Sequence, residues 1–101
     1  AQAGRPIKAV IAVDLYGNCP DYRELAPLCA RYGATLIEDA AESLGSIAYG
    51  QAAGSYGEFA ALSFNGNKII TTSGGGALLA GQEQAKRARW LAAQAREPKP
   101  Y

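Results

Sequence analysis

The sequence contains no histidine and no methionine, and only two of its 101 residues are cysteines. The lack of histidine excludes Ser-His-Asp and Cys-His nucleophilic catalysis and also histidine-ligated zinc. Cys19 and Cys29 are too few and too widely spaced to predict a disulfide framework or a metal site, so we expect reduced thiols. Any chemistry that these residues perform must therefore depend on lysine, carboxylates, tyrosine or a cofactor.

Long apolar runs and an excess of charge are also lacking. No stretch approaches the roughly 18 apolar residues that a membrane span needs, and the mixed first ten residues, broken by Pro6, are not typical of a signal peptide. The net charge of +1 gives no electrostatic reason to expect nucleic acid or a membrane as a partner. The late basic residues Lys86, Arg87, Arg89 and Arg96 are interpreted as the solvated face of a helix. We expect a globular cytoplasmic protein.

The length indicates one small domain, residues 1–101, with a limited core. The chain has no initiating methionine, and it stops at "EPKPY" without a recognisable terminal element. Both ends are therefore expected to be the edges of a longer protein.

The first half of the chain predicts a strand, a helix and a second strand. The apolar, β-branched run "KAVIAV" (8–13) is typical of a strand buried on both faces. Asp21 and Glu24 have the spacing of a capping box and predict a helix over about 22–32, which Gly33 ends. Pro27 should remove a hydrogen bond inside this helix and bend it. The expected apolar stripe comprises Leu25, Leu28, Cys29 and Tyr32.

The second half predicts two further strands and a closing helix. The second strand of the first half is expected at 34–40. The two further strands are expected at 58–64 and 77–80, with a long Gly-, Ser- and Ala-rich connection at 43–57 and a helix at about 82–96. The segment before 77–80 is too short for a helical crossover, so this strand is expected to run antiparallel. The fold class is therefore α/β, with a three-layer arrangement of a mostly parallel sheet and flanking helices.

Polar residues gather where the predicted parallel strands end, which is the edge where ligands bind in open α/β sheets. Asp39 and Glu42 follow the second strand, Ser63 ends the third, and Lys68 lies in the next turn. An ion pair between Asp39 and Lys68 and a cofactor site are both compatible with this spacing. The triple glycine 74–76 could be a flexible turn or could bind an anion through its backbone N–H groups.

Two stretches resemble the DegT-type (DegT/StrS) nucleotide-sugar aminotransferases, namely "LIEDAAESLGS" (36–46) and "GSYGEFAALSFNGNKIITTSGGGALL" (54–79). The resemblance extends from "VIAVDLYGN" to "QARE" and is greatest to the bacillosamine-type enzymes, which make 4-amino UDP-sugars. It implies part of the large domain of a fold type I transferase that uses pyridoxal 5'-phosphate. Many family members have a glutamate within the glycine turn, whereas this chain has Ser73 followed by three glycines.

The resemblance implies a role for each of the four polar residues. Lys68 matches the Schiff-base lysine, which must be neutral to attack a carbonyl and can later act as a general acid and base. Asp39 matches the aspartate beneath the pyridine nitrogen, and its carboxylate would keep that nitrogen protonated. Glu42 occupies the position near the ring's phenolic oxygen, often Gln or His. Ser63 matches a serine that donates a hydrogen bond to the cofactor phosphate.

The resemblance also implies partners and sets up rival interpretations. The substrates would be a nucleotide-linked keto sugar and an amino donor, usually glutamate, and a homodimer would complete each site. Because family members are several times longer, these 101 residues alone are expected to be inactive. The alternatives are a non-catalytic remnant that folds by self-association and a phosphate-binding module that uses the glycine turn.

Overall fold

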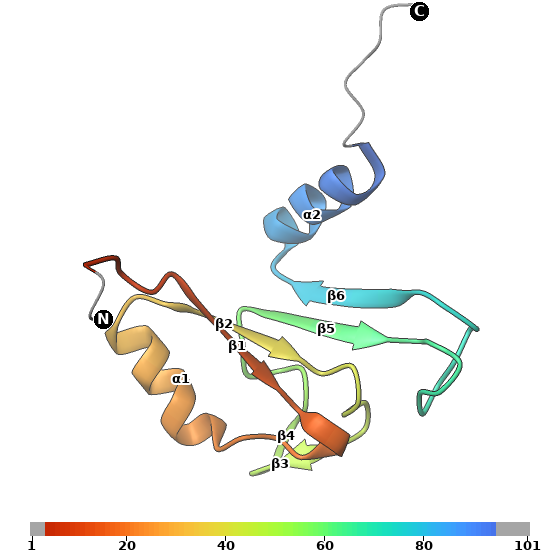
Figure 1. Ribbon diagram of the computed structural model, residues 1–101, viewed down its shortest axis with the longest axis horizontal. Helices are drawn as coiled ribbons and strands as arrows, with labels where there is room; N and C mark the ends of the chain where they lie inside the picture. Colours follow the sequence, from red (N-terminus) through yellow and green to blue (C-terminus); the bar gives the residue numbers. More distant parts are fainter. Residues whose placement is uncertain (1–3, 95–101) are drawn as a thin grey trace, which may run out of the picture.

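A computed structural model describes residues 4–94 and contains a four-stranded sheet (Figure 1). Its strands are β1 (Ala9–Val13), β2 (Thr35–Asp39), β5 (Phe59–Ser63) and β6 (Gly76–Ala80), in the spatial order β1-β2-β5-β6. β1, β2 and β5 run parallel, and β6 is antiparallel to β5. The four predicted strands and the antiparallel direction of the last one are confirmed.

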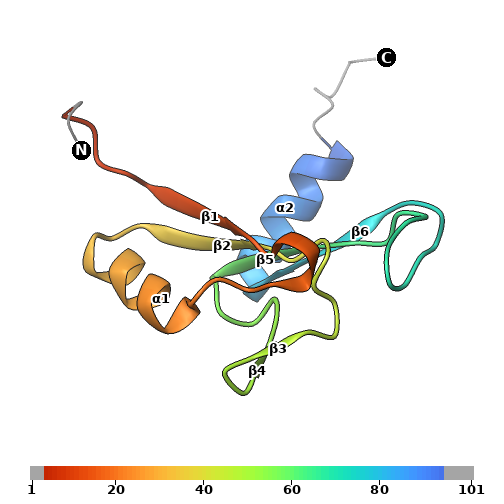
Figure 2. The same ribbon diagram turned by 60° about the horizontal axis from the view of Figure 1, so that its bottom comes forward.

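The sheet lies between two helices, α1 (Tyr22–Arg31) and α2 (Gln82–Gln94), with a short 3-10 turn, η1 (Leu15–Gly17), after β1. Figure 2 shows α1 below the sheet and α2 above it. α1 contacts β2, and α2 contacts β6. The predicted α/β class with flanking helices is confirmed, although residues 95–96 of the predicted last helix lie outside the described residues. No helix within residues 4–94 is long and apolar enough to cross a membrane.

The N-terminus of α1 is capped at the predicted residue but with different hydrogen bonds. The Asp21 side chain accepts a 3.0 Å hydrogen bond from the Arg23 N–H, and the Glu24 N–H donates to the Asp21 backbone oxygen at 3.1 Å. The predicted capping box, in which each of these side chains would accept from the other residue's N–H, does not form; Asp21 instead caps the helix through Arg23, with which it also forms an ion pair of 2.7 Å. Pro27 is exposed, and α1 continues past it.

The C-terminus of α1 ends at Gly33 as predicted. Gly33 has a φ of 64°, and its N–H donates to the Ala30 oxygen at 3.1 Å. The next N–H, of Ala34, donates to the Cys29 oxygen at 2.9 Å. These two bonds form a Schellman motif, which satisfies the last carbonyl groups and turns the chain into β2.

The connection between β2 and β5, expected to be irregular, contains a hairpin of β3 (Ile47–Ala48) and β4 (Gln51–Ala52). The two turn residues, Tyr49 and Gly50, have φ values of 50° and 82°, which is the signature of a type I′ turn. Tyrosine is an unusual residue at the first of these positions, and its ring lies 3.7 Å from the Arg23 guanidinium carbon. This cation–π contact holds the hairpin against α1.

The core lies between α1 and one face of the sheet. Its buried side chains are Ala12 of β1, Ala34 just before β2, Leu36 of β2, and Tyr22 and Cys29 of α1. The predicted apolar stripe of α1 is therefore partly wrong. Cys29 is buried as expected, but Leu28 and Tyr32 are exposed and line an open groove of about 410 Å³ together with Pro6, Ile7, Val10, Leu25, Cys29 and Ala34.

The other face of the sheet is open. Ile11, Val13 and Leu78 are 65%, 53% and 43% exposed. The prediction that 8–13 is buried on both faces is thus wrong for the described residues, because no element between residues 4 and 94 covers these side chains. α2 packs against β6, the edge strand farthest from β1 in the sheet.

Candidate functional site

Asp39 and Ser63 lie on neighbouring strands at the carboxyl edge of the sheet. Asp39 is opposite Ala61 in the β2–β5 register, and Ser63 is two residues farther along β5. Side chains two residues apart share a face and are separated by about 7 Å along a strand. The Asp39 carboxylate and the Ser63 hydroxyl are therefore on the same face, the open one, because Leu36 and Glu38 of β2 point toward α1.

Lys68 lies beyond β5 in the predicted turn, where its N–H donates to the Asn65 oxygen at 3.0 Å. Its side chain is only 16% exposed, and Nζ is 3.6 Å from Glu42 Oε1. The alternative ion pair between Asp39 and Lys68 is wrong. Asp39 accepts a hydrogen bond from the Ala41 N–H at its own strand end, and the turn that follows brings Glu42 to the lysine instead.

Glu42 joins the loops that follow all three parallel strands. While Oε1 faces Lys68 after β5, Oε2 accepts a 2.8 Å hydrogen bond from the Tyr16 N–H in the η1 turn after β1. Tyr16 has a φ of 53°, in the left-handed region that non-glycine residues rarely adopt, and the residue is 84% exposed. Sequence reasoning selected Glu42 but missed Tyr16, since nothing in "DLYGN" indicates which residue takes the left-handed conformation.

The glycine-rich segment between β5 and β6 is tied back to the end of β5. The Phe64 N–H donates to the Gly75 oxygen, and the Phe64 oxygen accepts from the Thr72 N–H, both at 3.0 Å. A Cβ on Gly76 would lie 2.5 Å from a backbone oxygen of β5. At least this glycine of the triplet is therefore required for the close packing of β6 on β5.

A buried polar cluster supports this edge from the α1 side. The Asp14 carboxylate is fully buried and accepts hydrogen bonds from Tyr22 Oη (2.6 Å) and Ser43 Oγ (2.7 Å). Burial, reinforced by Asp14, raises the pKa of the Cys19 thiol to about 11 and raises the pKa of Tyr22 well above its ordinary range. The cluster ties the end of β1, α1 and the connection after β2 together.

A second buried carboxylate, Glu38, fixes the end of that connection. It accepts hydrogen bonds from the backbone N–H groups of Gly54 (2.7 Å), Tyr56 and Gly57. The Tyr56 ring stacks on Tyr22, with 4.6 Å between centroids. Sequence reasoning missed both buried carboxylates, and the signal that could have found Glu38 was an acid inside an otherwise apolar strand.

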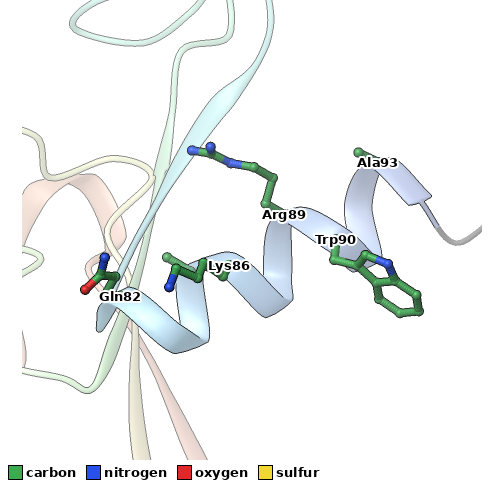
Figure 3. A pocket seen from close by; sticks show the side chains of 6 residues that line it. Gln82, Lys86, Arg89, Trp90 and Ala93 are labelled. Atoms are coloured by element: carbon green, nitrogen blue, oxygen red, sulfur yellow. The ribbon is translucent and has the colours of Figure 1, made fainter.

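The basic residues of α2 are remote from this edge. Because β6 is antiparallel to β5, α2 begins at the opposite edge of the sheet from Lys68 (Figure 1). A shallow groove of about 580 Å³ runs along α2, and every residue that lines it belongs to this one helix: Gln82, Ala85, Lys86, Arg89, Trp90 and Ala93 (Figure 3). Lys86 and Arg89 are exposed, as the prediction of a solvated face requires.

Comparison with known proteins matches residues 3–100 to the DegT/DnrJ/EryC1/StrS aminotransferase family. EpsN of Bacillus subtilis, which carries the provisional name of a pyridoxal phosphate-dependent aminotransferase, is 58% identical over 92 residues, 90% of this chain and 24% of EpsN. GDP-perosamine synthase of Vibrio cholerae is 41% identical over 76 residues, 75% of this chain and 21% of the synthase. The chain therefore spans about a quarter of the length of these relatives.

A solved structure shares the fold. The crystal structure of a DegT/DnrJ/EryC1/StrS aminotransferase from Brucella abortus superposes with a TM-score of 0.81 and 31% identity, covering 93% of this chain and 26% of that one. The mostly parallel sheet with flanking helices is thus an arrangement that occurs within a larger aminotransferase.

Proposed function

Because this chain belongs to the DegT/DnrJ/EryC1/StrS aminotransferase family, we propose that it is the cofactor-bearing part of a pyridoxal phosphate-dependent aminotransferase that acts on a nucleotide-linked keto sugar. The observation that carries the proposal is the shielded amine of Lys68, 16% exposed, at the sheet edge where Asp39 and Ser63 also lie. The substrate class is supported by GDP-perosamine synthase among the relatives.

The chemistry of these residues fits the proposed cofactor. Pyridoxal phosphate offers an aldehyde, a basic ring nitrogen, a phenolic oxygen and a phosphate. The edge offers an amine (Lys68), a carboxylate on the open face (Asp39), a second carboxylate (Glu42) and a hydroxyl (Ser63). When bound, the cofactor would supply an electron sink for charge that develops on the substrate carbon.

Each residue then has a distinct task. Lys68 would hold the aldehyde carbon of the cofactor and, when released, would move a proton to or from the substrate. Asp39 would keep the ring nitrogen protonated through a charge-assisted hydrogen bond. Ser63 would donate a hydrogen bond to the phosphate, and Glu42 would interact with the phenolic oxygen. The left-handed Tyr16 and the buried Glu38 fix the loops that carry these groups.

The finer features are part of the proposal. The amino donor is glutamate, the sugar is a UDP-linked 4-keto sugar, the enzyme acts in the cytoplasm as a homodimer, and a second subunit contributes to each site. The open face of the sheet, where Ile11 and Val13 are more than half exposed, supports a role for further protein that would cover it. The same face favours the rival interpretation, in which the chain folds by self-association without catalysis.

Titration of the purified 101-residue chain with pyridoxal phosphate tests the proposal. We expect a visible absorbance band and, after reduction with borohydride, a phosphopyridoxyl group on Lys68 by peptide mass mapping. Lys68→Ala should abolish the band, while the exposed Lys8 and Lys86 serve as internal controls for nonspecific labelling. Equal labelling of all lysines would contradict a cofactor site. Cofactor binding that survives Lys68→Ala and is displaced by inorganic phosphate would favour the phosphate-binding module.

A further inference from the structure

We propose that the side chain of Tyr16 binds the sugar ring of the substrate. The inference rests on the proposed function, in which a nucleotide-linked keto sugar reacts beside Lys68. Tyr16 lies in the η1 turn after β1, at the same edge of the sheet. Its backbone has a conformation that a tyrosine side chain disfavours, and no contact of that side chain within the described residues offsets this cost.

The η1 turn has the geometry of a type I′ turn. Tyr16 and Gly17 have φ values of 53° and 81°, and the Asn18 N–H closes the turn on the Leu15 oxygen at 3.0 Å. Because both central residues are left-handed, such turns prefer asparagine followed by glycine. The Cβ of any other residue crowds the following carbonyl oxygen, and tyrosine lacks the short polar side chain with which asparagine offsets this crowding. Tyr16 therefore destabilises its own turn.

The β3–β4 hairpin provides a matched comparison. Its turn residues Tyr49 and Gly50 have nearly the same φ values, 50° and 82°. Tyr49 is 52% exposed, and its ring lies 3.7 Å from the guanidinium carbon of Arg23, so a contact within the chain offsets the strain. Tyr16 is 84% exposed, and its side chain makes no hydrogen bond, ring stacking or cation–π contact with residues 4–94. A strained residue that the fold does not use is typical of a functional site.

The turn is held close to the reactive amine. The Tyr16 N–H donates to Glu42 Oε2 at 2.8 Å, and Oε1 of the same carboxylate is 3.6 Å from Lys68 Nζ. A Cβ on Gly17 would lie 3.3 Å from Ser46 Oγ, so the turn also packs closely against the connection after β2. The backbone of Tyr16 is thus fixed near Lys68 while its ring stays accessible. A group that is positioned in advance loses little freedom when a ligand binds.

This position selects the sugar among the parts of the substrate. A keto sugar reacts at a carbon of its ring, so the ring must lie next to Lys68, while the two phosphates hold the nucleotide base farther away. One face of a sugar ring presents C–H bonds that pack on an aromatic face, and its hydroxyl groups can pair with the phenol oxygen, which both donates and accepts. Tyrosine supplies both contacts from one rigid side chain.

Replacement by asparagine tests whether the ring of Tyr16 serves the fold. Tyr16→Asn keeps the N–H that donates to Glu42 and introduces the residue type that the turn prefers. It should lower the equilibrium constant of unfolding about five-fold in urea denaturation. Tyr49→Asn makes the same change in the hairpin but removes the contact with Arg23, so it should be less stable than Tyr16→Asn. A Tyr16→Asn chain less stable than the wild type would show that the ring supports the fold and would overturn the proposal.

Saturation-transfer difference NMR of the 101-residue chain with UDP-glucose tests the contact itself. This probe has no keto group and cannot react with Lys68. We expect saturation to reach the glucose ring protons, and the dissociation constant to rise about five-fold in Tyr16→Asn, the effect of losing one aromatic contact. Tyr49→Asn should bind as the wild type does. Equal binding by Tyr16→Asn, or no transfer to the glucose protons in the wild type, overturns the proposal.

The nucleotide base and the cofactor are the other candidate partners of the ring. If Tyr16→Asn loses transfer to the uracil protons but keeps transfer to the glucose protons, the ring binds the base and the proposal is wrong. It is also wrong if Tyr16→Asn only reduces the labelling of Lys68 by pyridoxal phosphate. Because the UDP-glucose experiment contains no pyridoxal phosphate, its failure is distinguishable from a failure of the proposed function, which appears as absent labelling of Lys68 in the wild-type chain.

Discussion

The buried carboxylate of Glu38 offers the sharpest test of how the site is supported. Its two oxygens accept three backbone N–H groups of the connection that leads into β5, and its side chain is fully buried. Oε1 accepts from Tyr56 and Gly57, and Oε2 accepts from Gly54. Glu38→Gln preserves one carbonyl oxygen for two of these donors but turns an NH₂ group toward the third, whereas Glu38→Ala leaves all three donors without an acceptor.

The expected cost follows from the number of unpaired donors. A buried donor left without a partner costs about 1–3 kcal/mol, so Glu38→Gln should lower the free energy of unfolding by about that amount. Three such donors in Glu38→Ala should cost about 3 kcal/mol or more. Since small domains are stable by about 5–15 kcal/mol in total, the Ala variant should lose a large part of its stability.

Urea denaturation followed by far-UV circular dichroism measures both variants. The tryptophan signal is a poor choice, because Trp90 is half-exposed on α2 and remote from the core. Glu58→Gln is the matched control, since Glu58 is exposed, and it should change the free energy of unfolding by less than about 0.5 kcal/mol. A Glu38→Gln variant as stable as the Glu58→Gln control would refute the assignment of Glu38 as the acceptor for the connection.

Three other predictions concern stability and are tested by denaturation. Burial raises the pKa of Cys19 from 9.0 to about 11, so its stabilising contribution is complete below pH 9 and is lost as the pH rises to about 11. Burial also raises the pKa of Tyr22 from 10.0 to well above its ordinary range, so its contribution begins to fall only above pH 10. The urea midpoint should therefore fall between pH 9 and 11, and less steeply in Cys19→Ala. Gly57→Ala should cost about 1–3 kcal/mol, because the added Cβ would lie 2.7 Å from a backbone oxygen of β2, while Gly66→Ala, with nothing within 4 Å, should cost much less. Pro27→Ala should raise the midpoint of thermal unfolding, because Pro27 is exposed and lies inside α1. A proline inside a helix removes one hydrogen bond and clashes with the preceding turn, and together these cost about 3 kcal/mol. An unchanged midpoint would show that α1 accommodates Pro27 without this cost.

The sheet could be predicted because its signals are local. The apolar run at 8–13, the helix start at Asp21 and the stop at Gly33 each depend on a few adjacent residues, and the structure has a strand and helix ends at these places. The hairpin at 47–52 could not be predicted in this way, because its left-handed residue Tyr49 is held by a contact with Arg23 of α1, 26 residues away in the chain.

The site was predictable as a set of residues but not as a set of contacts. Asp39, Ser63 and Lys68 share an edge because parallel strands end together, which the order of elements already implies. The partner of Lys68 depends on how the chain turns after β2, and spacing alone could not decide between Asp39 and Glu42. The buried carboxylates of Glu38, inside β2, and Asp14, just after β1, were missed because acidic residues are ordinarily expected at the surface.

The open face of the sheet implies that the two sides of each strand tolerate mutation differently. On β1, Ala12 faces the core and Ile11 faces outward, so a polar substitution of Ala12 should unfold the isolated chain, whereas one of Ile11 should leave it folded and even more soluble. Within a longer aminotransferase both positions would be constrained, but for different reasons. Mutational scanning of the chain alone and of a full-length relative would therefore separate residues that build this unit from residues that join it to the rest of the enzyme.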